Sequence, residues 1–376
     1  MHISVLRKLW WQSLTLIAIF IIRIFFRRDK KNIPADVLSK KFKNILVIRI
    51  DRIGDMLLAT PVFRTIKKVY PDSKLIVFAS SYNKNVIEGN PYVDKVLVHS
   101  GILSSLNTLE VEKFDLAIDL FCGFNLKSAL LCCLSNAEIK LGYKSKFSKH
   151  FFDFEVEPVK ESQYEAISNL KLLGPFGIKT NDIKLDVYPV ESNKKKNLNQ
   201  KIIGINIGTR RKVHRWSYEN FAALADKIIE KFNAQVIITW GPGELDLAKK
   251  TLASMKNGDG LLVASHCHKA VLAPGTDARQ LASLLNSFDL FICGDTGPFH
   301  IAVAMDIPVI AIFGKSDYIR WSPPFSKINV VADSSAISLP INRQLQSDIR
   351  IIAGKRCNEI TVDEVFSEVC EVLNAK

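Results

Sequence analysis

The stretch LFICGDTGPFHIAVAMDIPVIAIF (residues 290–313) is the clearest local indication of the fold, because two apolar runs enclose a short helical pattern. The runs 290–293 and 309–313 have the length and composition of buried strands. Between them, a turn with two glycines and a proline leads into the apolar segment 301–305. Proline is favoured in the first turn of a helix. A strand, helix and strand in this order predict a parallel sheet covered by helices.

Outward from this stretch, the same alternation fills most of the chain. It begins with the apolar run NILVIRI (44–50) and a helical pattern at 56–69 that ends at a Tyr-Pro pair. Further strands are predicted at 74–79, 95–98, 115–120, 138–141, 202–207, 235–240, 270–272 and 327–331. The polar, Lys- and Asn-rich stretch 179–201 separates two such series and is expected to connect two domains. We therefore expect an α/β protein with two Rossmann-like domains facing a cleft.

This organisation divides the 376 residues into four expected segments. They are a membrane-associated helix with a basic linker (1–43), an N-terminal Rossmann-like domain (44–185), a C-terminal Rossmann-like domain (200–355) and a C-terminal helix (356–376). A composition of 48% hydrophobic and 24% charged residues is near the globular average, so most of the chain is expected to fold.

The positive charge is concentrated at the N-terminus. Ten Lys and Arg residues against two aspartates give residues 1–43 a charge of +8, out of +13 for the chain. The apolar run LWWQSLTLIAIFIIRIFF (9–26) lies between basic pairs at 7–8 and 27–28. This pattern is typical of a helix lying in the surface of an anionic membrane. A single membrane span and a helix packed on the folded body are the alternatives, whereas a cleaved signal peptide and a nucleic-acid site are not indicated.

The seven cysteines show neither CxxC pairs nor the spacing of metal ligands. Reduced thiols in a cytoplasmic body are therefore expected. Cys132 and Cys133 lie in an apolar run and are predicted to be buried by packing.

Three junctions between a strand and a helix could carry chemistry. The first is RIDRIGD (49–55), where Gly54 permits a close turn and Asp55 lies where the helix begins. Asp55 could accept backbone N–H bonds as a helix cap. Alternatively, it faces the cleft and acts as a general base toward an acceptor hydroxyl.

The second junction is GTRRKVHRW (208–216), with a glycine, a hydroxyl and four cationic side chains ahead of a helix. Thr209, Arg210, Lys212 and His214 are candidate ligands for a diphosphate. The alternative is a solvated basic loop.

The third junction is CGDTGPFH (293–300), where the glycines let backbone approach a ligand. The free amides and the positive end of the helix dipole are expected to face an anion. The alternative is an ordinary turn in which Thr296 caps the helix and His300 is buried with its hydrogen bonds satisfied.

Three motifs together resemble one known family. IRIDRIGDMLLATPVFRTIK (48–67), GTRRKVHRW (208–216) and ICGDTGPFHIAVAMDIPVIAIFG (292–314), in this order and spacing, resemble the glycosyltransferase family 9 heptosyltransferases of lipopolysaccharide synthesis. The likeness extends from about residue 44 to about residue 324.

The resemblance implies an inverting, metal-independent GT-B enzyme that uses ADP-heptose and no cofactor. Asp55 matches the catalytic base, while Arg52 and Lys127 are expected on the acceptor side in the N-terminal domain. Residues matching the donor site in the C-terminal domain are Thr209, Arg210, Glu244, Asp295, Thr296, Gly297 and His300. The C-terminal helix, predicted at 362–373, is expected to cross back onto the first domain.

The expected partners are a nucleotide-sugar donor, an anionic lipid-linked glycan acceptor such as the lipopolysaccharide core, and the cytoplasmic surface of the inner membrane. One departure concerns the donor, because His214 stands where the family usually has lysine. An imidazole has an unperturbed pKa near 6.5 and stabilises a leaving diphosphate less than a permanent cation.

Three alternatives follow. A GT-B transferase with another nucleotide sugar fits the same fold, and so does a non-catalytic, membrane-tethered binding protein. A nicotinamide-dependent oxidoreductase is disfavoured because neither half begins with a GxGxxG turn.

Overall fold

The computed structural model describes residues 40–110, 112–191, 200–209, 214–256, 269–330, 336–338 and 348–374, together with Ser13, Ile17 and Phe20. Apart from those three residues, the predicted N-terminal membrane helix lies outside the described residues, as do the candidate ligands Arg210 and Lys212. In the part of the chain that is described, no helix combines the length and the apolar character needed to cross a membrane.

The N-terminal half forms a six-stranded parallel sheet in the order β3-β2-β1-β4-β5-β6. Its strands are β1 (Asn44–Arg49), β2 (Lys74–Ser80), β3 (Lys95–His99), β4 (Leu116–Asp119), β5 (Ile139–Tyr143) and β6 (Phe154–Val156). Its helices are α2 (Ile53–Leu57), α3 (Thr60–Val69), α4 (Ile102–Glu110), α5 (Leu126–Cys133) and α6 (Glu165–Lys171).

The C-terminal half forms an eight-stranded sheet in the order β13-β12-β14-β11-β10-β7-β8-β9, parallel except for β13. Its strands are β7 (Ile202–Asn206), β8 (Gln235–Thr239), β9 (Ala270–Leu272), β10 (Leu290–Gly294), β11 (Val309–Gly314), β12 (Lys327–Val330), β13 (Ala336–Ser338) and β14 (Ile349–Ala353). Its helices are α7 (Tyr218–Phe232), α8 (Leu245–Ala253), α9 (Ala278–Leu285), α10 (Gly297–Ala304), α11 (Tyr318–Trp321) and α12 (Val362–Asn374).

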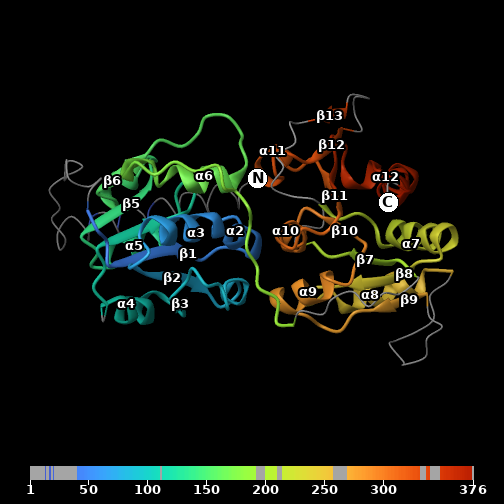
Figure 1. The fold of residues 1–376 in the computed structure, drawn as a ribbon, viewed down its shortest axis with the longest axis horizontal. Coiled ribbons are helices and arrows are strands. Elements are labelled where there is room, and N and C mark those ends of the chain that lie inside the picture. The colour runs from blue at the N-terminus through green and yellow to red at the C-terminus, as the bar shows by residue number, and fades with distance from the viewer. Residues whose placement is uncertain are drawn as a thin grey trace.

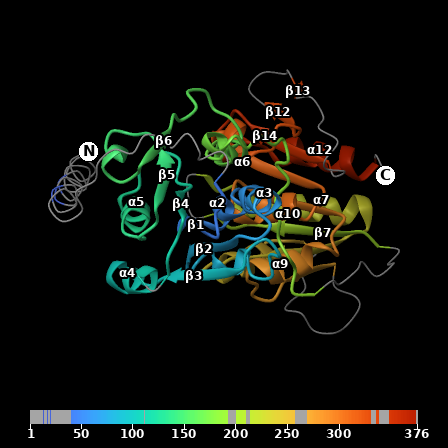
Figure 2. The same ribbon diagram turned by 60° about the vertical axis from the view of Figure 1, so that its left-hand side comes forward.

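Each sheet is covered on both faces, which explains why its strands are continuously apolar. In β1, Ile45 and Val47 belong to one core cluster, whereas Leu46 and Ile48 belong to another on the opposite face. The cluster that contains Ile45 continues into the second half, where it includes Phe299 of α10. The two α/β domains therefore share apolar packing at their junction, where α2 and α10 lie side by side (Figures 1 and 2).

The predicted connection between the domains is partly described and is anchored to both. Arg64 of α3 donates to Asp182 at 2.7 and 2.9 Å and to the carbonyl of Lys184 at 2.6 Å. Farther along, Arg279 of α9 donates to the carbonyl of Tyr188 at 2.8 Å. The segment thus leaves the first domain along α3 and reaches the second along α9, down the junction in Figure 1.

Several local expectations need correction. The helix predicted at 56–69 is two helices, because α2 ends at Leu57 and α3 begins at Thr60 with Pro61 in its first turn. Strand β14 was not predicted, since Arg350 interrupts its apolar run. The buried Arg350 side chain is accommodated by ion pairs with Asp348, Glu368 and Glu371.

The C-terminal helix does not cross back onto the first domain, so that expectation is wrong. The buried side chains of α12, among them Val365 and Val369, pack in one cluster with Ile228 and Ile229 of α7. Its apolar face is therefore used within the second domain. The prediction for Cys132 and Cys133 is confirmed, because both are buried in the core of the first domain.

Candidate active site at the domain junction

The first and third junctions meet where α2 and α10 touch, and glycines permit the close approach. A Cβ atom added at Gly54 would lie 2.6 Å from Cδ2 of His300. On the facing helix, a Cβ atom at Gly297 would lie 3.1 Å from Cγ2 of Ile53. A side chain at residue 54 would therefore collide with the His300 ring, and one at residue 297 would press on Ile53. The tight turn predicted at Gly54 is wrong, because Gly54 lies inside α2; the glycine instead permits the contact with the other domain.

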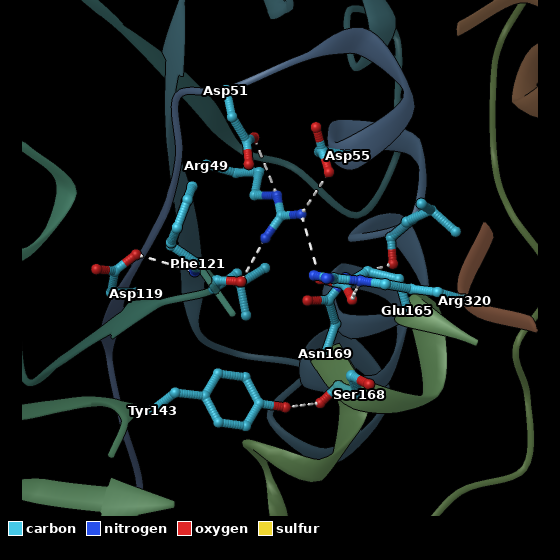
Figure 3. Close-up of polar contacts among 12 residues, drawn as sticks. Arg49, Asp51, Asp55, Asp119, Phe121, Tyr143, Glu165, Ser168, Asn169 and Arg320 are labelled. Atoms are coloured by element: carbon cyan, nitrogen blue, oxygen red, sulfur yellow. Dashed lines mark hydrogen bonds and ion pairs between the residues drawn. The ribbon is translucent and has the colours of Figure 1, made fainter. Parts of the chain in front are cut away.

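Asp55 lies inside α2 and does not cap it. The residue that precedes the helix is Arg52, whose side chain makes no capping bond. The Asp55 carboxylate accepts instead from Nη2 of Arg49 at 3.2 Å (Figure 3). With 15% of its side chain exposed, Asp55 is accessible to a ligand and is oriented by a buried cation. The helix-cap interpretation is therefore wrong.

Asp295 lies across the junction from Asp55. Burial raises the pKa of Asp295, while a hydrogen bond from Ser316 and the charges of His214 and Arg52 oppose the rise. The Asp55 carboxylate adds to it. The structure thus brings Asp55, Arg52, Asp295 and His214 into one electrostatic neighbourhood.

The N-terminus of α10 is free of a side-chain cap. Thr296 is in the N-cap position with extended backbone, but its hydroxyl makes no capping bond and donates to the carbonyl of Gly294 at 3.4 Å. Pro298 occupies the first turn, as predicted. Because no side chain caps the first turn, its N–H groups suit an anion.

His300 is buried but is not satisfied. Only 4% of it is exposed, and its Nδ1 has no hydrogen-bond partner. Burial lowers its pKa to about 4, against the opposing attraction of the Asp55 carboxylate. The side chain is therefore a neutral imidazole at neutral pH, with one polar nitrogen unused.

The described part of the second junction lies beside the third. Nδ1 of His214 is 3.3 Å from Oγ of Ser316, the residue that also bonds Asp295. Thr209 is buried, and its carbonyl accepts from Arg215 at 2.7 Å. The solvated-loop alternative does not describe these residues.

Glu244, the residue that precedes α8, also lies near this group. Its Oε2 accepts from the backbone N–H of Gly241 at 2.9 Å, and its carboxylate occupies the space that a side chain at residue 208 would need. Glu244 therefore lies against the backbone that leads to Thr209.

Lys127 is exposed at the start of α5. Its backbone N–H donates to Asn125 at 2.9 Å. Burial lowers the pKa of His99 on β3, and the charge of Lys127 lowers it further. The structure therefore places Lys127 in the electrostatic environment of His99 on β3.

Residues that the sequence analysis missed surround Arg49. The Arg49 side chain is buried, donates to the carbonyl of Leu120, and lies 3.1 Å from Asp51 and 3.7 Å from Glu165 (Figure 3). Burial alone would lower its pKa, but the surrounding carboxylates outweigh burial and raise it. The sequence indicated this cluster only through Arg49, a charged residue at the end of an apolar strand.

Two further carboxyl groups beside Arg49 hold their protons unusually tightly. Burial raises the pKa of Asp51 to about 6, although Arg49 lowers it. Burial likewise raises the pKa of Asp119 to about 7, although the Phe121 N–H and the Ser128 hydroxyl bond its carboxylate. The described residues contain no cluster of three or more His, Cys, Asp or Glu side chains suited to a metal ion.

Comparison with known proteins identifies the family. A family model described as glycosyltransferase family 9 (heptosyltransferase) matches residues 102–344, well over half of the chain. Lipopolysaccharide heptosyltransferase 3 of Escherichia coli is 28% identical over 72% of this chain and 83% of its own length.

Two solved structures share the fold. The family 9 glycosyl transferase of Veillonella parvula superposes with a TM-score of 0.71 at 20% identity, covering 89% of this chain and 98% of its own. The E. coli ADP-heptose lps heptosyltransferase II gives 0.68 at 19% identity, covering 88% and 99%. With the family match across both domains and three motifs gathered at their junction, the chain belongs to glycosyltransferase family 9 and is a glycosyltransferase.

Proposed function

We propose that the protein transfers heptose from ADP-heptose to a lipopolysaccharide core or a related cell-envelope glycan, with inversion and without a metal ion. The observation that carries this proposal is the juxtaposition of α2, which carries Asp55, with His300 and the uncapped start of α10. The names of the relatives support the donor and acceptor, since they include an ADP-heptose lps heptosyltransferase and a lipopolysaccharide heptosyltransferase.

In this mechanism Asp55 is the general base. Its carboxylate accepts the proton of the acceptor hydroxyl as that oxygen attacks the anomeric carbon from the face opposite the diphosphate. The new bond joins the acceptor oxygen to the anomeric carbon, and the bond from that carbon to the diphosphate oxygen breaks. Attack from the opposite face inverts the configuration.

The second domain supplies the stabilisation of the leaving group. Negative charge develops on the diphosphate as it departs, and backbone N–H groups at the start of α10 are suited to receive it. Thr209, Arg210 and Lys212 are proposed to complete the phosphate site, with Glu244 at the nucleoside. Because the N–H groups at the start of α10 belong to a regular helix, they need little reorganisation in the transition state.

A transferase using another nucleotide sugar is the second candidate, and one observation favours it. His214 stands where the family usually has lysine, and its ring contacts Ser316 beside Asp295. Purified protein incubated with ADP-heptose and other nucleotide sugars, with and without a truncated lipid acceptor, distinguishes the two. Acceptor-dependent release of ADP supports heptosyl transfer, whereas release of a different nucleotide supports the alternative.

The base assignment makes a direct prediction. Asp55→Ala is expected to abolish detectable transfer, because a general base contributes about 100- to 10,000-fold, while the dissociation constant for ADP stays within about twofold. Radiolabelled sugar transfer and titration calorimetry measure the two quantities. Asp72→Asn, at an exposed position, is the matched control. Transfer by Asp55→Ala at the native rate would refute the assignment.

We further propose that residues 1–43 hold the enzyme at the cytoplasmic face of the inner membrane, where the lipid-linked acceptor is located. The support is the charge of +8 in this segment and the apolar run at 9–26.

A further inference from the structure

A chain of charged side chains joins the second domain to Asp55. Arg320 of α11 donates from Nε to Oε2 of Glu165 on α6 at 3.0 Å. The other oxygen, Oε1, lies 3.7 Å from Nη2 of Arg49, and the same Nη2 donates to Asp55 at 3.2 Å. Figure 3 shows the four side chains.

The helix that carries Glu165 is fixed in place. Asn169 of α6 is fully buried and donates to the carbonyl of Leu58, between α2 and α3, at 2.9 Å. The hydroxyl of the buried Tyr143 donates to the carbonyl of Ser168 (Figure 3). These bonds attach α6 to β5 and to the end of α2. The Glu165 carboxylate, 2% exposed, therefore has a defined position relative to Asp55.

The single positive charge of Arg49 is shared among several carboxylates. Asp51, Asp55 and Glu165 all lie within 3.7 Å of its guanidinium, and Asp119 also acts on it electrostatically. Arg320 supplies Glu165 with a second cation. Without Arg320, Glu165 would be a buried carboxylate dependent on Arg49 alone, and it would draw Arg49 from Asp55.

Stability alone does not account for this arrangement. A buried ion pair contributes little net stability, because desolvation of the charges offsets their attraction. A buried ion pair does favour one arrangement of its side chains. If one charged group moves away, its partner remains buried without an opposite charge. General-base catalysis needs that property, because an error of about 1 Å in a reacting group costs about 100-fold in rate.

We propose that Glu165 and Arg320 are positioning residues that hold Arg49, and through it Asp55, in the working orientation when the two domains are in contact. The second domain thus contributes to the base as well as to the donor site. This inference rests on the proposed function of Asp55, and Arg49 is the residue through which the effect passes.

The test uses the full-length protein with Glu165→Gln, Arg320→Met and the double variant. Each single variant is expected to lower kcat for transfer by about 10- to 100-fold, with the ADP dissociation constant within about twofold. Arg320→Lys is expected to recover part of kcat, because it restores a cation. In the double variant, the melting temperature is expected to return toward the native value, since no charge is left unpaired, while kcat stays low.

Ser162→Ala is the matched control for contact between the domains. Its hydroxyl donates to Asp317, the residue preceding α11, at 2.7 Å, so the variant removes a bond across the same junction without touching the charges. It is expected to keep native kcat. A native kcat for Arg320→Met, or recovery of kcat together with the melting temperature in the double variant, overturns the inference. Asp55→Ala, measured in parallel, separates the two proposals, because activity in that variant refutes the base itself.

Discussion

At the scale of single residues, burial makes His300 a source of pH-dependent stability. In an unfolded chain a histidine binds its proton near pH 6.5, whereas burial lowers the pKa of His300 to about 4. Between these values the unfolded state binds more protons than the folded state, so the stability of the protein falls as the pH falls. The contribution of His300 is present above pH 6.5 and is lost toward pH 4.

His300→Asn is therefore expected to remove this part of the acid sensitivity. Across the window from pH 6.5 to 4, the native protein should lose about 3 kcal/mol of unfolding free energy that the variant does not lose. Urea unfolding of both proteins at several pH values measures the difference. Parallel stability curves across the window would contradict the account, whatever the offset between them.

The site was predictable from the sequence where a side chain lies just beyond the carboxyl end of a strand. Asp295 directly follows β10, and Asp55 lies on the short helix that follows β1; in each sheet this is where α/β folds place ligands. For Arg49 the sequence offered only a weak indication of a role, namely a charged residue at the end of an apolar run. Glu165 and Arg320 gave none, since their roles depend on contacts between segments 155 residues apart.

At the scale of elements, the crossing of α2 and α10 places the proposed base against the donor-binding helix. Gly54 is inside a helix, where alanine normally stabilises because it restricts the unfolded chain. Here the added methyl would meet the buried ring of His300, which has little room to move. The steric effect should therefore outweigh the helix preference.

Gly54→Ala is expected to lower the free energy of unfolding by about 1–3 kcal/mol and to reduce transfer as α2 and α10 separate. Chemical denaturation and the transfer assay measure both effects. Gly174→Ala is the control, because a Cβ atom there meets no other atom within 4 Å. If Gly54→Ala were as stable and active as the control, the contact would not matter.

Elements were predictable where the hydrophobic pattern was uninterrupted. Strands β1, β10 and β11 follow from continuous apolar runs. Strand β14 was missed because the buried Arg350 interrupts its apolar pattern. The carboxylates that pair with Arg350 come from α12 and from the residue before the strand. The position of α12 could not be inferred, since an apolar helix face does not specify which of two domains it covers.

At the scale of the whole molecule, the charge distribution predicts where the enzyme works. Residues 1–43 carry most of the net charge, beside an apolar run. Each basic residue close to an anionic membrane contributes about 1 kcal/mol of attraction. A glycosyltransferase with a lipid-linked acceptor would gain access to its substrate in this way.

The vesicle prediction compares two sets of three charges in the full-length protein. Changing Arg27, Arg28 and Lys30 to Gln is expected to weaken sedimentation with anionic vesicles by more than about tenfold. The same change at Lys194, Lys195 and Lys196, in the interdomain connection, should have little effect. Equal losses for both sets, or equal binding to neutral vesicles, would argue against N-terminal anchoring.

A structure of the enzyme with intact ADP-heptose tests the central claim most directly, because it shows whether both domains act on one sugar. The account predicts the diphosphate at the start of α10, beside Thr296, and the anomeric carbon on the side that faces Asp55. A nucleotide sugar bound away from α10, or an Asp55 carboxylate directed away from the sugar, would contradict it.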